Sequence, residues 1–151
     1  MILVSHRGNT HGPNPQFENH PKYIEDALSL GYNVEIDVRY VDGGFMLGHD
    51  EPQYLVNLEF FHVRKDRLWC HAKNLPALVR MIDMGLNCFW HENDGYTVTS
   101  AGYIWAYPGM IAEPSRTVCV MPEFVDGWKG SPFGVCSDYI GDSEILKAWN
   151  K

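Results

Sequence analysis

The segment Asn33-Val-Glu-Ile-Asp-Val38 alternates between apolar and polar or acidic residues. This pattern predicts a β-strand with three aliphatic side chains on one face and Glu35 and Asp37 on the other. A helical pattern that begins at Pro21 and ends at Gly31 precedes it. Strand and helix patterns alternate through about the first 90 residues. This alternation indicates parallel strands joined by right-handed helical crossovers.

The same periodicities predict the other elements. A hairpin turn is expected over 41–45, and strands at 2–5, 45–48, 68–73, 87–91, 103–107, 117–121 and 133–137. Helices are expected at 54–65, at 74–85 and after a cap at Asp142 or Ser143. The helix over 54–65 is expected to bury Leu55, Leu58 and Phe61, with Phe60 as a further candidate. The helix over 74–85 carries an apolar stripe of Leu75, Leu78, Val79 and Ile82.

These elements predict one α/β domain over residues 1–151. A complete (β/α) barrel usually needs about 200 residues or more. We therefore expect a reduced barrel of the TIM type, in which loops replace helices in the second half. An open doubly wound sheet is the alternative.

Composition narrows the class of protein. The chain has 151 residues, 45% of them hydrophobic, and a formal net charge of −7, which fits a folded domain and argues against a nucleic-acid partner. Apolar runs are too short to span a bilayer, and the first residues lack signal-peptide features, so a cytoplasmic protein is expected. The cysteines lie in apolar runs without metal-site spacing, which predicts buried free thiols at Cys70, Cys88, Cys119 and Cys136.

Ionisable residues recur where the predicted strands end. In a parallel α/β fold these carboxyl ends lie on one side of the sheet, where sites form. Two carboxylates that point into the interior are costly unless a cation or hydrogen-bond donors compensate them. The residues are His6 and Arg7, Glu35 and Asp37, His49 and Asp50, His71 and Lys73, and His91 and Glu92.

A divalent metal ion would compensate the two carboxylates. Glu35 and Asp37 suit Mg²⁺ or Ca²⁺, with water and a substrate oxygen completing the coordination. His71 lies on the adjacent predicted strand with the parity to join them. An imidazole ligand would shift the preference toward Mn²⁺ or Zn²⁺.

The remaining polar residues suit a phosphate ester. His6 and His49 offer a general acid and a general base, because imidazole titrates near neutral pH. Arg7 and Lys73 could bind phosphate oxygens, Arg7 through its planar fork and Lys73 as a point charge. Together these groups can cleave a phosphodiester.

In order and spacing, these residues resemble the glycerophosphodiester phosphodiesterase family, within the barrel phosphodiesterases that include phosphatidylinositol-specific phospholipase C. The resemblance covers roughly the first third of the chain and rests on Ser5-His-Arg-Gly8, Phe17-Glu-Asn19, Glu35-Ile-Asp-Val38, Asp42-Gly43 and Gly48-His-Asp50. It implies that His6 and His49 are the catalytic pair, that Arg7 binds phosphate, and that the metal ligands include Glu35 and Asp37.

The resemblance extends less closely to later residues. Lys73 matches the lysine that closes the family's third strand, but His71 stands where the family usually has a glutamate ligand. Gly134-Val-Cys-Ser-Asp138 is similar to the family's last strand. The insertion that many members carry after the second strand is absent, so the substrate is not specified.

We therefore predict a metal-dependent phosphodiesterase that acts on a small glycerophosphodiester-like molecule. One alternative is a catalytically degenerate module that binds a phosphate headgroup or a sugar phosphate. Another is a metal-dependent hydrolase of a different ester or an amide. Trp105 and Trp128, expected near loops, are the two tryptophans that could stack on a sugar.

Overall fold

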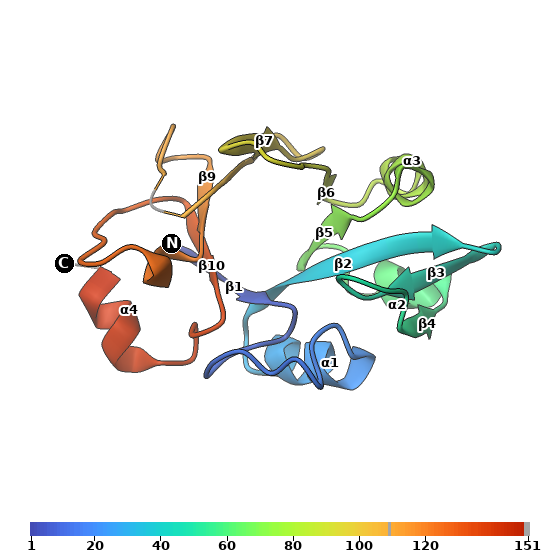
Figure 1. Ribbon diagram of the computed structural model, residues 1–151, viewed down its shortest axis with the longest axis horizontal. Helices are drawn as coiled ribbons and strands as arrows, with labels where there is room; N and C mark the ends of the chain where they lie inside the picture. Colours follow the sequence, from blue (N-terminus) through green and yellow to red (C-terminus); the bar gives the residue numbers. More distant parts are fainter. Residues whose placement is uncertain (109, 150–151) are drawn as a thin grey trace.

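The computed structural model describes residues 1–108 and 110–149 and shows a mixed α/β fold built on one curled sheet. The parallel strands follow the spatial order β6-β5-β2-β1-β10-β9-β8. Figure 1 shows them around a common interior, as a partial barrel. They are β1 (Ile2–His6), β2 (Asn33–Val41), β5 (Leu68–Ala72), β6 (Cys88–Phe89), β8 (Ile104–Ala106), β9 (Thr117–Val120) and β10 (Gly134–Ser137).

β6 and β8 are the first and last strands of the parallel run, and the chain segment between them in sequence makes hydrogen bonds to both. β7 (Tyr96–Val98) pairs antiparallel with β8. Two residues farther on, Ser100 N donates to Cys88 O at 2.8 Å, and Cys88 N donates to the Ser100 hydroxyl at 2.9 Å. Residues 96–100 therefore link the two ends of the parallel run.

β2 continues beyond the parallel sheet into an antiparallel hairpin. It pairs with β3 (Gly44–Leu47), and β4 (Tyr54–Val56) pairs with β3 at the outer edge. The turn residues Asp42 and Gly43 both have positive φ, 49° and 84°. Tight hairpins favour this conformation because it matches the twist of the flanking strands. The predicted hairpin is confirmed.

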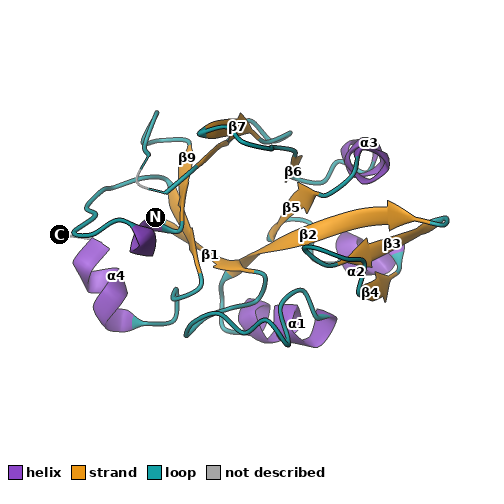
Figure 2. Ribbon diagram, viewed as in Figure 1, coloured by secondary structure: helices purple, strands orange, loops and turns teal. Residues whose placement is uncertain are grey.

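Helices lie outside the sheet and are concentrated in the first half of the chain (Figure 2). α1 (Pro21–Ser29) and α3 (Leu75–Asp83) follow β1 and β5, and the Asn74 side chain caps α3 by accepting a bond from Ala77 N at 3.0 Å. Between α3 and α4 (Ser143–Trp149), the described residues form only a short 3₁₀ helix, η1 (Pro122–Phe124). The second half has few helices, as predicted.

The predicted helix over 54–65 is wrong in its first part. Residues 54–56 form β4, and α2 (Leu58–His62) begins only after Asn57, whose side chain accepts a bond from Phe60 N. Because an N-cap residue directly precedes the first turn of a helix, Asn57 separates β4 from α2, where a single helix was predicted. Leu55 and Leu58, expected inside, are 72% and 61% exposed.

Most of the apolar stripe predicted on α3 faces outward; only Leu78 of its four residues packs against the core, where it is half-buried. Ala77 and Met81 are buried, whereas Leu75, Val79 and Ile82 are exposed. α3 is apolar on more than one side, so its periodicity could not select the face that meets β2, β5 and β6. At the contact with the sheet, the small side chain of Ala77 is completely buried.

A layer of apolar side chains, three of them aromatic, fills the interior of the curled sheet. Trp105 stacks near Trp69 there, with ring centroids 5.8 Å apart. Trp105 and Trp128, the two tryptophans considered for stacking on a sugar, are both buried: Trp105 lies in β8, and Trp128 lies in a loop, as expected, but packs against Trp149 of α4. The interior layer consists of Val4, Trp69, Phe89, Trp105, Val118 and Cys136.

The predicted free thiols are confirmed, since all four cysteines are buried and none forms a disulfide. Among the described residues, no helix has both the length and the apolar character needed to cross a bilayer.

Candidate active site

Polar side chains occupy the interior above the apolar layer, at the carboxyl ends of the parallel strands. Strand register places them there. Glu35 on β2 pairs with His6 on β1, and Asp37 pairs with His71 on β5. Trp69, two residues before His71, pairs with Glu35 and belongs to the apolar layer. The inward face of each strand therefore changes from apolar to ionisable toward its carboxyl end.

Glu35, Asp37 and His71 form a compact acidic cluster. One donor atom from each lies within 4.8 Å of the others, and the two carboxylates are 2% and 0% exposed. His71 Nδ1 is 3.8 Å from Glu35 Oε1 and 3.3 Å from Asp37 Oδ1. Glu35 Oε2 and Asp37 Oδ1 are buried without a hydrogen-bond donor. Buried oxygens of this kind are costly unless something compensates them.

The three groups titrate differently. Burial and the adjacent Asp37 charge raise the pKa of Glu35 to about 7. Burial also acts to raise the pKa of Asp37, but the nearby His71 and Arg7 side chains lower it below its ordinary value. Burial lowers the pKa of His71 despite the Asp37 contact. Near neutral pH, His71 is therefore a neutral imidazole with a free lone pair, the form that binds metals.

His6 and Asp138 form a second unit next to the cluster. His6 Nδ1 lies 2.8 Å from Asp138 Oδ1, and His6 Nε2 lies 3.9 Å from Glu35 Oε2. An ionised carboxylate can only accept, so Nδ1 carries the proton and Nε2 faces the cluster. Burial lowers the pKa of His6, but the Asp138 bond and the Glu35 charge raise it above its ordinary value. Asn9 Nδ2 also donates to Asp138 Oδ1, at 2.7 Å.

Cations surround Asp37. Arg7 Nε forms an ion pair with Asp37 Oδ2 at 3.0 Å, and Arg7 Nη1 donates to Glu18 Oε2 at 3.1 Å. Lys73 Nζ lies 3.8 Å from Asp37 Oδ1. Arg7 and Lys73, both predicted to bind phosphate, therefore lie next to Asp37. Two nitrogens of the Arg7 guanidinium already contact carboxylates of the protein. Asn19 Nδ2 also donates to Asp37 Oδ2, at 2.9 Å.

His49 is set apart from the other predicted site residues. Its side chain is 39% exposed, and Nδ1 contacts the neighbouring Asp50 at 2.7 Å. Arg39 donates to the His49 carbonyl, and Gly48 N donates to Asp37 O. These bonds fix the loop next to β2. Within the described part of the chain, no hydrogen bond or ion pair joins the His49 ring to the cluster.

His91, noted only as a polar residue at a strand end, stacks on His71. The ring centroids are 4.5 Å apart and the planes are inclined by 11°. Phe89 adds a second nearly parallel contact, 5.1 Å from His71. This packing fixes the plane of the His71 imidazole, which orients its Nδ1 toward the carboxylates.

The site also includes four surrounding residues that were not predicted from the sequence. A signal was present for three of them, Glu18, Asn19 and Asp138, since the Phe17-Glu-Asn19 and Gly134–Asp138 segments carried the family resemblance; Asn9 lies outside these segments. Their contacts could not be predicted, because they join positions far apart in sequence. They are Asn9, Glu18, Asn19 and Asp138.

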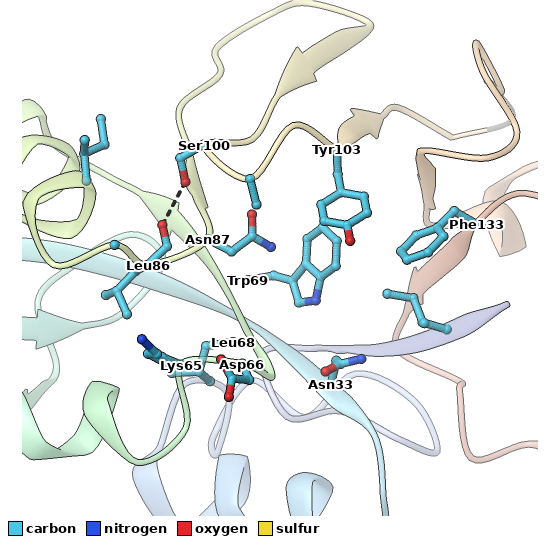
Figure 3. A pocket seen from close by; sticks show the side chains of 14 residues that line it. Asn33, Lys65, Asp66, Leu68, Trp69, Leu86, Asn87, Ser100, Tyr103 and Phe133 are labelled. Atoms are coloured by element: carbon cyan, nitrogen blue, oxygen red, sulfur yellow. Dashed lines mark hydrogen bonds between the residues drawn. The ribbon is translucent and has the colours of Figure 1, made fainter.

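A separate cavity of about 550 Å³ opens at the amino ends of the strands (Figure 3). Trp69, Tyr103 and Phe133 line it together with Asn33 and Asn87. None of its lining residues belongs to the acidic cluster, and the apolar interior layer lies between the two. The candidate active site is therefore the polar cluster at the carboxyl ends.

The cluster has the ligands that a divalent cation requires. Two carboxyl groups and one neutral imidazole match known oxygen and nitrogen ligand sets, and one oxygen of each carboxyl group accepts no hydrogen bond. Comparison with known proteins adds no assignment, since no family model, curated protein or solved structure matches the chain.

Proposed function

We propose that this protein is a divalent-cation-dependent phosphodiesterase that cleaves a small glycerophosphodiester-like substrate. The partial barrel is then a reduced barrel of the TIM type, with its site in the usual place at the carboxyl ends of the strands. The observation that carries the proposal is the pair of buried oxygens that accept no hydrogen bond, Glu35 Oε2 and Asp37 Oδ1, next to His71.

Glu35, Asp37 and His71 would hold the cation. Mg²⁺ or Ca²⁺ suits the carboxylates, and the imidazole favours Mn²⁺ or Zn²⁺. When bound, such an ion polarises a phosphoryl oxygen and lowers the pKa of a coordinated hydroxyl or water. Lys73 and Arg7 lie on the same side of the sheet and would stabilise the negative charge of a phosphate held there.

His6 suits the role of general acid. Its proton on Nδ1 is fixed by Asp138, and Nε2 faces the cluster. The raised pKa keeps the ring protonated to higher pH, so Nε2 can donate a proton to the leaving oxygen. His49 would then be the base that removes a proton from the attacking hydroxyl or water.

The exposure of His49 favours a second candidate function. A site that only binds a phosphate headgroup or sugar phosphate needs no second histidine facing the cluster, and the His49 ring is 39% exposed and contacts Asp50. The buried carboxylate pair opposes this alternative, because anion binding does not require two unpaired carboxylate oxygens.

The test is hydrolysis of bis(p-nitrophenyl) phosphate and a panel of glycerophosphodiesters by metal-stripped protein, resupplied in turn with Mg²⁺, Ca²⁺, Mn²⁺ and Zn²⁺. We expect cation-dependent cleavage that falls roughly a hundredfold or more in His6→Ala and in His49→Ala. His62→Ala is the matched control, since His62 is exposed on α2 and does not belong to the cluster.

Three other results of the hydrolysis test would contradict the proposal or favour one of its alternatives. Wild-type activity in His49→Ala would contradict its catalytic role. Binding of phosphate diesters without cleavage under any metal would favour the binding module. Cleavage of carboxylic esters or amides, with phosphodiesters left intact, would assign the site to another class of hydrolase.

A further inference from the structure

The two oxygens of Asp37 have different surroundings. Oδ2 accepts a hydrogen bond from Asn19 Nδ2 at 2.9 Å and pairs with Arg7 Nε at 3.0 Å. Oδ1 accepts no hydrogen bond and lies 3.3 Å from the His71 imidazole Nδ1 and 3.8 Å from the Lys73 ammonium Nζ. One oxygen is bound to the protein, and the other is left available.

Asn19 makes a two-point contact that fixes this arrangement. In addition to its bond to Oδ2, its Oδ1 accepts a bond from Asp37 N at 2.9 Å. The same amide therefore binds the backbone and the carboxylate of one residue. Asn19 is 1% exposed, so solvent does not compete for these bonds.

Backbone strain accompanies this contact. Asn19 and Arg7 have φ values of 63° and 54°, in the left-handed region that non-glycine residues rarely adopt. Asn19 N donates to Arg7 O at 2.9 Å, so the two strained residues are directly linked. Both direct their side chains at the same oxygen, Asp37 Oδ2. Strain of this kind costs free energy and persists where the surrounding structure requires it.

We infer that Asn19 is a positioning residue, which holds Asp37 so that only its Oδ1 oxygen is offered to a divalent cation. The inference rests on the proposed function, because it assumes that the cluster binds a metal. Residues that orient a metal ligand without touching the metal typically contribute ten- to a hundredfold to affinity. Asn19 acts through Asp37 and is not itself a catalytic residue.

Mn²⁺ binding, followed by electron paramagnetic resonance and calorimetry, tests this role. Asn19→Gly keeps a left-handed backbone accessible but removes the amide. We expect its affinity for Mn²⁺ to fall roughly tenfold or more. The control is Asn74→Gly, because the Asn74 amide also makes a two-point contact with one residue of β2, accepting from Tyr40 N and donating to Tyr40 O, both at 3.1 Å, without touching a carboxylate. Its affinity should stay within about twofold of wild type.

A second measurement does not depend on the variant folding. The infrared carboxylate bands of wild-type protein labelled with ¹³C on the aspartate side chain should show one-oxygen coordination when Mn²⁺ is added. A two-oxygen signature, or wild-type affinity in folded Asn19→Gly, would overturn the inference and leave the proposed metal site standing. Absence of Mn²⁺ binding to wild type would overturn both.

Discussion

Glu35 and Trp69 are direct neighbours in the pairing of β2 with β5, and both lie in the interior of the curled sheet. The indole belongs to the apolar layer directly below the acidic cluster. Burial in this interior and the charge of the adjacent Asp37 raise the pKa of Glu35 to about 7.

Glu35 should make the metal-free protein less stable as the pH rises. Its folded pKa lies above its unfolded value, so the folded state binds the extra proton between about pH 4.5 and 7, and stability falls across this window. The shift corresponds to about 3 kcal/mol. Urea unfolding between about pH 4 and 8 measures this loss of stability. Glu35→Gln should remove most of the fall, whereas Glu51→Gln, at an exposed position, should retain it.

Asp138→Asn should reduce catalysis and shift its pH dependence. Asp138 raises the pKa of His6, so removing its charge lowers that pKa. A general acid at His6 would then lose its proton at lower pH, so the alkaline limb of the pH profile of kcat should shift to lower pH. We also expect kcat to fall roughly ten- to a hundredfold. Asp126→Asn, at an exposed site, is the control; an unmoved alkaline limb would rule out His6 as the acid.

Lys73→Ala should weaken substrate binding. Its ammonium group lies 3.8 Å from Asp37 Oδ1, where it can contact a phosphate held at the cluster. Loss of one such contact should raise KM for bis(p-nitrophenyl) phosphate about tenfold. Lys65→Ala provides the comparison, because Lys65 is exposed and lines the cavity at the opposite ends of the strands. Equal effects of the two substitutions would contradict a local role for Lys73.

Trp105→Ala should destabilise the fold. The ring is 5% exposed and packs against Trp69 and Phe89, so truncation leaves a cavity in the interior layer. The expected loss is about 3–5 kcal/mol, measured by denaturant unfolding. Phe124→Ala removes an aromatic ring that is 72% exposed and should change stability by about 0.5 kcal/mol or less. A similarly small change for Trp105 would show that its ring lies outside the core.

Local patterns predicted those features of the fold that depend on neighbouring residues. The alternation around Glu35 and Asp37 predicted a strand and two inward carboxylates, and both are buried. The Asp42-Gly43 turn also follows from local chemistry, because positive φ suits these residues. His71 could be placed next to Asp37 because strand parity and sheet order together fix that contact.

Features that depend on distant residues could not be predicted in this way. The outward-facing side of α3 was decided by how the helix packs on the sheet, and α3 is apolar on both sides. Asn19 meets Asp37, and Asp138 meets His6, through contacts that only the folded chain creates. The position of the His49 ring depends on loop bonds that include Arg39.

The adjacency of β1 and β10 also bears on when the site can form during synthesis. His6 is among the first residues made, but the strand that precedes Asp138 pairs with β1 only after most of the chain has been translated. Glu35, Asp37 and His71 are all made well before Asp138, so during synthesis His6 lacks the carboxylate that orients its ring. The contact between His6 and Asp138 can therefore form only late, after every residue of the acidic cluster has left the ribosome's catalytic centre.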